Sequence, residues 1–252
     1  MLTLRNISVR LGNKPILQDV SFALRPHRIT ALVGRNGSGK STLLGCVNQQ
    51  ISYTGEIWEG EKNLALLSPR ERAKTVAILP QKLPVPHITG CQMVSFGRNP
   101  YLDITGRLTE KDRQAVATAF KDADAAELAQ RYADTLSGGE MQRLALAMIL
   151  AQNTPIALLD EPTAHMDLGY EGAFLQKLIQ LKQQRKKTFL IVMHDLTQAV
   201  RYADDLLVLD GGKLVFSGTK EECLQQRILE KTFGLRRFTA EEKGEQQIFF
   251  TP

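Results

Sequence analysis

Residues 34–41 have the types and the spacing of a phosphate-binding loop. They read Gly34-Arg35-Asn36-Gly37-Ser38-Gly39-Lys40-Ser41 and fit the pattern G-x-x-x-x-G-K-S/T. The glycines let backbone N–H groups close on an anion, and a helix that starts after the loop adds the positive end of its dipole. In such a loop Lys40 reaches the β- and γ-phosphates, and the Ser41 hydroxyl ligates Mg²⁺. The sequence therefore predicts a site for a nucleoside triphosphate and Mg²⁺.

The flanking sequence favours this interpretation over a glycine-rich turn that fits by chance. Residues 28–33 are mostly apolar and predict a short buried strand. The residues from Ser41 onwards predict the start of a helix. A strand, a glycine-rich loop and a helix in this order are the setting in which the motif binds phosphate.

A second group of residues offers carboxylates at the end of a predicted strand. The apolar residues 156–159 are followed directly by Asp160 and Glu161. Beside a phosphate-binding loop, Asp160 is a candidate Mg²⁺ ligand. Glu161 is a candidate base that orients and deprotonates an attacking water. An ordinary acidic turn explains these two residues equally well on their own, but less well with a phosphate-binding loop in the same chain.

A third group combines a helix cap with two glycines. Ser137 and Glu140 have the spacing of a capping box, and an apolar helix is predicted to follow them. Gly138 and Gly139 fall in the first turn of that helix, where each costs up to about 1 kcal/mol relative to alanine. A capped helix needs no glycine there, so these glycines indicate N–H groups kept bare for an anion.

In their order along the chain these motifs resemble those of the ATP-binding-cassette (ABC) ATPases, and the resemblance covers essentially the whole chain. The residues that carry it are 34–41, Gln81, 136–140, Asp160, Glu161, Asp167 and His194. The resemblance implies that two copies sandwich two ATP molecules. The serine–glycine–glycine helix of one copy then covers the γ-phosphate that the other copy binds.

The same resemblance implies a role for each site residue. Gln81 contacts Mg²⁺ and senses the helical insert, His194 hydrogen-bonds the γ-phosphate, and Asp167 lies in a loop that crosses the dimer interface. Without the resemblance, His194 is more simply a strand-end histidine satisfied locally. The expected catalytic residues are Glu161, His194 and Gln81, and the expected Mg²⁺ ligands are Ser41, Gln81 and Asp160. The expected ATP-binding residues are Leu11, Gly34, Arg35, Asn36, Gly37, Ser38, Gly39, Lys40, Ser41, Thr42, Ser137, Gly138, Gly139, Glu140 and Asp167.

Leu11 departs from the family pattern. Family members usually place an aromatic ring under the adenine, just before the turn that follows the first strand, and this chain has Leu11-Gly12 there. Leucine packs against adenine but cannot stack on it, and stacking contributes roughly 1–3 kcal/mol per base. We therefore expect nucleotide binding that is weaker or less selective for the base.

The rest of the sequence predicts an α/β fold. The expected architecture is a P-loop NTPase core with a mostly parallel sheet and flanking helices, an N-terminal antiparallel β subdomain and an inserted helical subdomain. Strands are expected at 2–9, 16–24, 53–58, 75–79, 156–159 and 188–193, helices at 89–98 and 109–131, and a hairpin at 206–216. The single ABC ATPase domain, 1–252, is expected to have its core in 1–85 and 151–225, a helical insert in 86–150 and a C-terminal extension in 226–252.

Composition narrows the range of partners. The chain has 252 residues and a net charge of +5, and no apolar run is long enough to cross a bilayer. The N-terminus lacks the basic-then-apolar order of a signal peptide, and three scattered cysteines suit a reducing compartment. Lys and Arg are spread out apart from short groups at 185–187 and 236–237, and aromatics make up only 6%, so no nucleic-acid partner is expected.

Segments 94–101 and 199–204 resemble the ATPases of bacterial importers for ferric siderophores, haem and cobalamin. The resemblance implies a pair of ATPases beneath integral-membrane permease subunits, at the cytoplasmic face of the membrane, with an external binding protein that delivers the chelate. The proline-rich and then helical region 82–101 is the expected docking region for the permease. A soluble regulatory ABC ATPase, an ATPase of another transporter class and a nucleic-acid-linked cassette stay open as alternatives, and the sequence does not identify the transported chelate.

Overall fold

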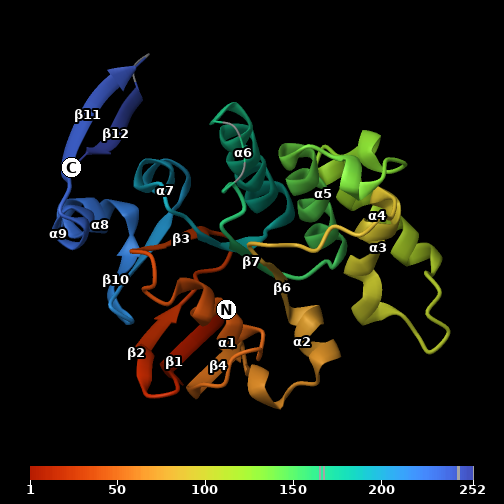
Figure 1. Cartoon of the computed structure of the whole chain (residues 1–252), viewed down its shortest axis with the longest axis horizontal. Helices are drawn as coiled ribbons and strands as arrows, with labels where there is room; N and C mark the ends of the chain where they lie inside the picture. The colour runs from red at the N-terminus through yellow and green to blue at the C-terminus, as the bar shows by residue number, and fades with distance from the viewer. Residues whose placement is uncertain (165, 167, 243–244, 252) are drawn as a thin grey trace. The chain divides into compact units, whose positions relative to one another are not determined.

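The computed structural model describes residues 1–164, 166, 168–242 and 245–251. The chain divides into two units (Figure 1), one formed by Met1–Leu66 with Thr188–Pro252 and the other by Leu67–Lys187. The predicted helical insert, 86–150, lies inside the second unit. The predicted limits of the core and the C-terminal extension stay a prediction.

In the first unit the N-terminal residues form the predicted antiparallel sheet. Its strand order is β2-β1-β4-β5, and the strands are β1 (Leu2–Leu11), β2 (Lys14–Ala23), β4 (Thr54–Glu59) and β5 (Lys62–Asn63). The apolar side chains of β1 that the alternating pattern selects are buried. The pattern changes phase between Leu4 and Ile7, because the pairing with β2 shifts there and Asn6 has a positive φ of 53°. The short 3-10 helix η1 (Leu64–Leu66) follows β5.

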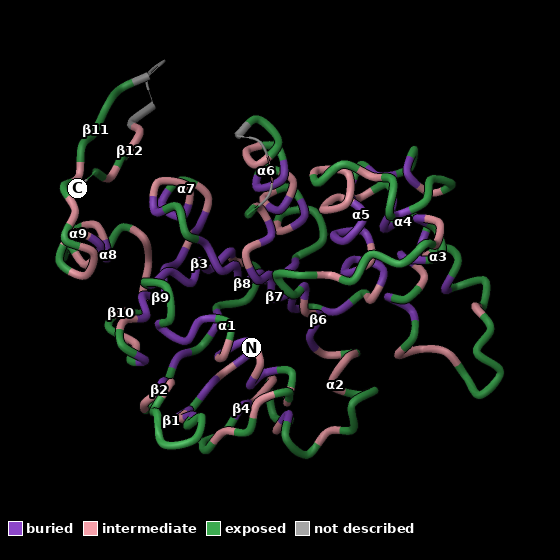
Figure 2. Tube along the Cα trace, viewed as in Figure 1, coloured by how far each residue is buried: buried purple, intermediate pink, exposed green. Residues whose placement is uncertain are grey.

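A second sheet in this unit contains the strand that leads into the phosphate-binding loop. Strand β3 (Ile29–Gly34) lies between β8 (Thr188–Val192) and β9 (Asp205–Asp210) and is parallel to both, and β10 (Lys213–Thr219) pairs with β9 as the predicted hairpin. Every residue of β3 and β8 is buried (Figure 2). Helices α1 (Lys40–Val47) and α7 (Leu196–Tyr202) follow β3 and β8. Such continuous apolar strands are typical of a parallel sheet covered by helices.

The C-terminal part forms structure that the sequence did not reveal. Helix α8 (Lys220–Gln225) begins at a capping box formed by Thr219 and Glu222. Helix α9 (Ile228–Phe233) and a hairpin of β11 (Arg236–Glu242) and β12 (Glu245–Thr251) then occupy most of the predicted extension. Strand β12 lies against α7, so the extension is attached to the first unit.

The second unit joins two parallel strands to a group of helices. Strands β6 (Val76–Leu79) and β7 (Ile156–Asp160) are parallel, with Leu79 opposite Leu159. The helices are α2 (Pro69–Thr75), α3 (Gly90–Ser95), α4 (Glu110–Asp122), α5 (Gly138–Ala151) and α6 (Leu168–Arg185). Helices α3 and α4 both pack against α5, which confirms the helical insert. Together the two units have the mixed, mostly parallel architecture that the sequence predicts, with an antiparallel N-terminal sheet.

Two predicted helices are wrong in their lengths. Helix α3 ends at Ser95 and continues as the 3-10 helix η2 (Phe96–Tyr101), which contains Pro100 and so lacks one backbone donor. Helix α4 ends at Asp122 instead of extending to residue 131. Asp124 adopts a left-handed conformation, with a φ of 49°, and the chain then forms the short 3-10 helices η3 (Ala126–Leu128) and η4 (Ala133–Thr135). The alanine-rich composition of this region concealed the turn.

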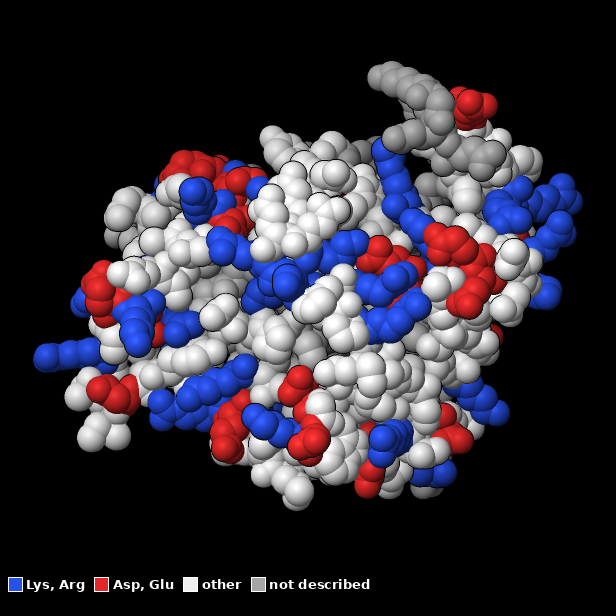
Figure 3. Space-filling view, turned by 180° about the vertical axis from the view of Figure 1, so that it is seen from behind, with Lys and Arg blue, Asp and Glu red and all other residues white. Residues whose placement is uncertain are grey.

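The distribution of charged side chains on the surface is consistent with the modest net charge. Acidic and basic side chains are interspersed on the face shown in Figure 3, and the basic ones are densest across its middle. No helix among the described residues has both the length and the hydropathy of a membrane span.

A buried ion pair fixes the helices of the second unit. Arg98 and Asp112 are 7% and 3% exposed, and Nε of Arg98 lies 2.9 Å from Oδ1 of Asp112. The other carboxylate oxygen accepts from the backbone N–H and the hydroxyl of Thr109, and the hydroxyl bond is the largest cause of the lowered pKa of Asp112. Arg98 also donates to the carbonyl of Ala151 at 2.7 Å and lies over the ring of Tyr101. One pair of charges thus connects η2, α4 and the end of α5.

Replacing Asp112 with alanine should destabilise the protein by about 3–5 kcal/mol, because it leaves a buried guanidinium without its carboxylate. The matched control is Glu110→Ala in the same helical turn, whose carboxylate pairs with Arg113 at 3.3 Å with both side chains exposed. That control should cost less than about 1 kcal/mol. Urea unfolding of both variants measures the difference, and equal losses would contradict the role given to the buried pair.

Candidate functional site

The phosphate-binding loop connects β3 to α1 and needs glycine at particular positions. Gly39 has a φ of +102°, and a Cβ added there would lie 2.6 Å from Cδ2 of Leu17 on β2. A Cβ at Gly34 would lie 2.3 Å from the carbonyl oxygen of Leu209 on β9. Two of the glycines are therefore required by the loop's own packing, since the neighbouring strands leave no room for a side chain.

The interior of the loop carries donors suited to phosphate oxygens. Lys40 is only 6% exposed, and its Nζ donates to the carbonyl oxygens of Gly34 at 2.9 Å and Arg35 at 3.2 Å. The ammonium therefore lies within the curve of the loop. The hydroxyl of Ser38 is buried and has no hydrogen-bond partner among the described residues. A buried hydroxyl in that position calls for a partner, and a phosphate oxygen would supply one.

The other predicted residues of the loop differ in how they face solvent. The side chain of Arg35 is exposed and donates to the carbonyl of Thr232 on α9 at 2.9 Å, so only its backbone remains for a phosphate. Asn36 and Ser41 are exposed, and Thr42 is half-buried. The Ser41 hydroxyl, in the first turn of α1, is therefore open to a metal ion.

His194 lies at the same sheet edge as the phosphate-binding loop. Strands β3 and β8 are parallel, with Leu32 opposite Val192, and the N–H of Met193 donates to the carbonyl of Leu32 at 3.2 Å. Because parallel strands end at a common edge, His194 and the start of the loop leave the sheet side by side. Asp195, the next residue, caps α7 by accepting from the N–H of Gln198 at 3.1 Å. The cap fixes the backbone that carries the exposed histidine.

Leu11 ends β1 and is exposed over 56% of its surface. The partner strand β2 lies against the loop, since Ile16 and Leu17 are the nearest neighbours of Gly39. The N-terminal sheet therefore flanks the phosphate-binding loop, and an apolar side chain at its end is available to a base.

In the second unit, Gln81 and Glu161 meet at the ends of two parallel strands. Leu79 lies opposite Leu159, so the residues after β6 and β7 leave at the same edge. Nε2 of Gln81 donates to Oε2 of Glu161 at 2.6 Å. Glu161 has a φ of 50°, a conformation that non-glycine residues seldom adopt and that is common at functional sites.

The residues expected to hold Mg²⁺ have the donor chemistry that this ion prefers. Asp160, the last residue of β7, is 8% exposed, and Gln81 donates through its amide nitrogen, which leaves the amide oxygen for a cation. In the first unit, the hydroxyl of Ser41 offers a further oxygen, and oxygen is the ligand type that hard cations require. The residues fit Mg²⁺, which would neutralise phosphate charge when bound.

The start of α5 is capped in the predicted way. The N–H of Ser137 donates to Oε2 of Glu140 at 2.8 Å, and the Ser137 hydroxyl accepts from the N–H of Glu140 at 3.4 Å. The backbone bond to Ser137, followed by the bond to its hydroxyl and the ion pair with Arg131, lowers the pKa of Glu140 to about 2. The carboxylate therefore stays charged and holds the helix start in place.

Packing against the described residues does not explain the glycine at position 139 of this helix start. A Cβ at Gly139 would come no closer than 3.7 Å to the ring of Tyr170, which is ordinary contact. Ser137 and Gly138 are exposed. The contrast with Gly34 and Gly39 indicates that the bare surface serves a contact outside this chain.

The comparison with known families decides the identity of these motifs. A model of the ABC transporter family matches residues 17–164. The chain belongs to this family. It is an ABC ATPase, which hydrolyses ATP to drive transport.

Individual relatives cover nearly the whole ABC ATPase chain. The iron(3+)-hydroxamate import ATP-binding protein FhuC of Bacillus subtilis (strain 168) is 36% identical over 234 residues, which are 92% of this chain and 87% of that protein. The hemin import ATP-binding protein HmuV of Rhodococcus jostii (strain RHA1) is 37% identical over 237 residues, or 92% of this chain and 80% of that protein. A chain from an ABC transporter assigned to the metal-chelate type, in an inward-facing conformation, superposes with a TM-score of 0.86 at 26% identity, covering 100% of this chain and 96% of that one.

One site residue of the ABC ATPase lies outside the described residues, and one contact was missed. Asp167, expected in the loop at the dimer interface, is among the residues that the structure leaves undescribed. Arg131, which pairs with Glu140, was not predicted. Turns at η3 and η4 bring it to the helix start, and no sequence spacing signals such a contact.

The geometry of Leu11 gives a prediction about base selectivity in this ABC ATPase. Unlabelled GTP should displace labelled ATP nearly as well as unlabelled ATP does, because an exposed leucine packs on any base. Leu11→Tyr should tighten ATP binding by a stacking contribution of roughly 1–3 kcal/mol. Competition binding with labelled ATP measures both effects. The control is Leu66→Tyr, an exposed leucine of the same unit outside the nucleotide region, and strong ATP selectivity of the unaltered protein would contradict the prediction.

Proposed function

We propose that this chain is the ATP-binding and ATP-hydrolysing subunit of an importer for a metal chelate of the siderophore or haem type. The observation that carries the proposal is the hydrogen bond between Gln81 and Glu161. This bond connects the expected catalytic carboxylate of Glu161 to Gln81, the residue directly before the segment 82–101. The names of the relatives support the chelate class, since they import hydroxamate-bound iron and hemin.

In the proposed reaction each site residue has a distinct task. Lys40 and the loop N–H groups would hold the phosphates, and Ser41, Asp160 and Gln81 are the residues that would hold Mg²⁺. Glu161 orients the attacking water and accepts its proton, while His194 hydrogen-bonds the γ-phosphate. The bond from Gln81 orients the Glu161 carboxylate.

A second copy of the chain is proposed to complete the site. The start of α5 is capped, exposed at Ser137 and Gly138, and free of side chains at Gly138 and Gly139, although no described residue packs closely enough to require glycine at 139. Bare N–H groups at a helix start are suited to the γ-phosphate. ATP bound by one copy would therefore be covered by α5 of the other, and hydrolysis would release the pair.

The region 82–101 is proposed to receive the permease. Apolar side chains are exposed in and beside it: Val85 is 46% exposed, Phe96 is 50% exposed, and Ile104 is fully exposed. Exposed apolar groups gathered along one segment mark a contact with another protein. Docked there, the subunit would be held at the cytoplasmic face of the membrane, and it would act on the external binding protein only through the permease.

Glu161→Gln should separate ATP binding from hydrolysis. Phosphate release should fall by about 100-fold or more, since the base is lost while the phosphate-holding residues remain. With ATP present, the variant should accumulate as a dimer, measured by light scattering on a sizing column. Adding Gly139→Glu should abolish that dimer but leave the monomer folded. Unchanged turnover in Glu161→Gln would contradict the catalytic role, and a dimer that persists in the double variant would contradict closure on α5.

Phe96→Asp should uncouple the ATPase from transport. Phe96 is half-exposed in the proposed docking region, so a carboxylate there should abolish co-purification with the permease and uptake of the chelate, while the isolated subunit keeps its ATPase rate. The control is Phe238→Asp on β11, a residue that is 52% exposed and outside that region. Uptake that survives Phe96→Asp would contradict the docking region. An ATPase rate that does not change when the permease is added would favour the alternative of a regulatory ABC ATPase.

A further inference from the structure

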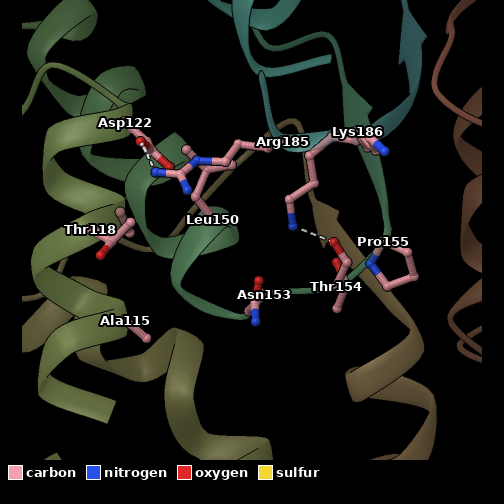
Figure 4. A pocket seen from close by; sticks show the side chains of 11 residues that line it. Ala115, Thr118, Asp122, Leu150, Asn153, Thr154, Pro155, Arg185 and Lys186 are labelled. Carbon is pink, nitrogen blue, oxygen red and sulfur yellow. Dashed lines mark hydrogen bonds and ion pairs between the residues drawn. The ribbon is translucent and has the colours of Figure 1, made fainter. Parts of the chain in front are cut away.

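The second unit holds a polar pocket that the proposed function does not use. Its volume is about 490 Å³, in the range of small-molecule sites. It lies between one face of α4, the turn from α5 to β7 and the end of α6 (Figure 4). The residues that line it are Ala115, Thr118, Ala119, Asp122, Leu150, Asn153, Thr154, Pro155, Arg185, Lys186 and Lys187.

The charges of this pocket do not balance. Nη2 of Arg185 pairs with Oδ1 of Asp122 at 2.8 Å, so these two opposite charges offset each other. Asp122 is the only carboxylate among the lining residues, and it is offset by Arg185, whereas Lys187 adds a further buried basic group. The pocket therefore has an excess of positive charge.

Lys187 is the most deeply buried basic residue of this pocket. It is 8% exposed, and its ammonium donates to the carbonyl oxygen of Thr154. No carboxylate among the described residues forms an ion pair with it, so the charge faces a neutral acceptor and the pocket. Burial accordingly lowers the pKa of Lys187 to about 8. A buried charge without an ion-pair partner is costly, and an anion in the pocket would reduce that cost.

We propose that this pocket binds a small oxyanion of the phosphate-monoester class, held by the ammonium of Lys187. Figure 4 shows Thr118 on α4 and Asn153 on the turn after α5, where a hydroxyl and an amide can serve the remaining oxygens. The cavity is larger than an inorganic anion, which leaves room for the organic part of a monoester. Free phosphate compounds and lipid headgroups share this chemistry.

The anion affinity should depend on pH through Lys187. The charged groups that act on it are Asp122 on α4 and Arg185 at the end of α6, and the lining residues of the α5–β7 turn are uncharged. Arg185 stays charged, because its bond to Asp122 raises its pKa. An anion favours the protonated lysine, so binding is strong below the free pKa of about 8 and weakens above it. The loss should approach about tenfold per pH unit.

Sulfate is the probe for the test, since its charge is constant over this pH range. Equilibrium dialysis with radiolabelled sulfate is run on the full chain at saturating ADP, so that the phosphate-binding loop is occupied. Lys187→Met removes the charge at similar length and should weaken sulfate binding at least about tenfold. Its control is Lys121→Met, an exposed lysine of α4 outside the pocket.

A second pair of variants keeps Lys187 and guards against misfolding. Thr118 is an exposed pocket residue of α4, and Thr118→Glu places a competing carboxylate there. It should weaken sulfate binding as Lys187→Met does. Ala117→Glu adds the same charge at an exposed position of the helix that does not line the pocket, and it should leave the affinity unchanged.

The outcomes decide the proposal and the source of the ligand. Loss in both pocket variants but in neither control, together with weaker binding above about pH 8, supports the site. Equal affinity in all variants, affinity independent of pH, or failure of glycerol phosphate to displace sulfate would overturn it. If glycerol phosphate displaces sulfate, vesicles that contain phosphatidic acid are tested next. Displacement of sulfate by these vesicles would identify the ligand as a lipid headgroup. Vesicles that do not displace it assign a free phosphate monoester.

Discussion

The parallel pairing of buried strands determines where chemistry can take place in this chain. Parallel strands end at a common edge, so residues far apart in the sequence emerge together. The pairing of β3 with β8 places the phosphate-binding loop beside His194. The pairing of β6 with β7 places Gln81 beside Glu161, close enough for a hydrogen bond of 2.6 Å. A shift of either register by one residue would separate these groups and turn their side chains to the other face.

Glycine has two different meanings in the candidate site. At Gly34 and Gly39 the packing of the chain itself excludes a side chain. At Gly139 it does not, and a methyl group would meet only ordinary contact with Tyr170. Helix α5 nevertheless keeps glycine in its first turn, where alanine would favour the helix by up to about 1 kcal/mol. This loss of helix stability is explained if the helix start must closely approach a phosphate held by a second copy of the chain.

The sequence predicted those parts of the structure that depend on local rules. The phosphate-binding loop and the capping box at Ser137 both depend on neighbours within a few residues, and the structure contains them. The contact between Gln81 and Glu161 depends on the register of two strands, which no local pattern fixes. The end of α4 depends on one left-handed residue, Asp124, within an alanine-rich stretch. The C-terminal hairpin also escaped prediction, because a polar strand pair leaves only a weak pattern.

Two buried charges of the second unit differ in how fully hydrogen bonds and ion pairs compensate their burial. Asp112 accepts from Arg98 and from two groups of Thr109, and its pKa falls, so burial is fully compensated. Lys187 is equally hidden but donates to a single carbonyl, and its pKa falls towards neutrality, the direction that opposes its charge. A purely structural position would tolerate methionine there at less cost. A lysine in this position, at the wall of a cavity with excess positive charge, is therefore better explained by an anion that enters the cavity than by the packing of the chain alone.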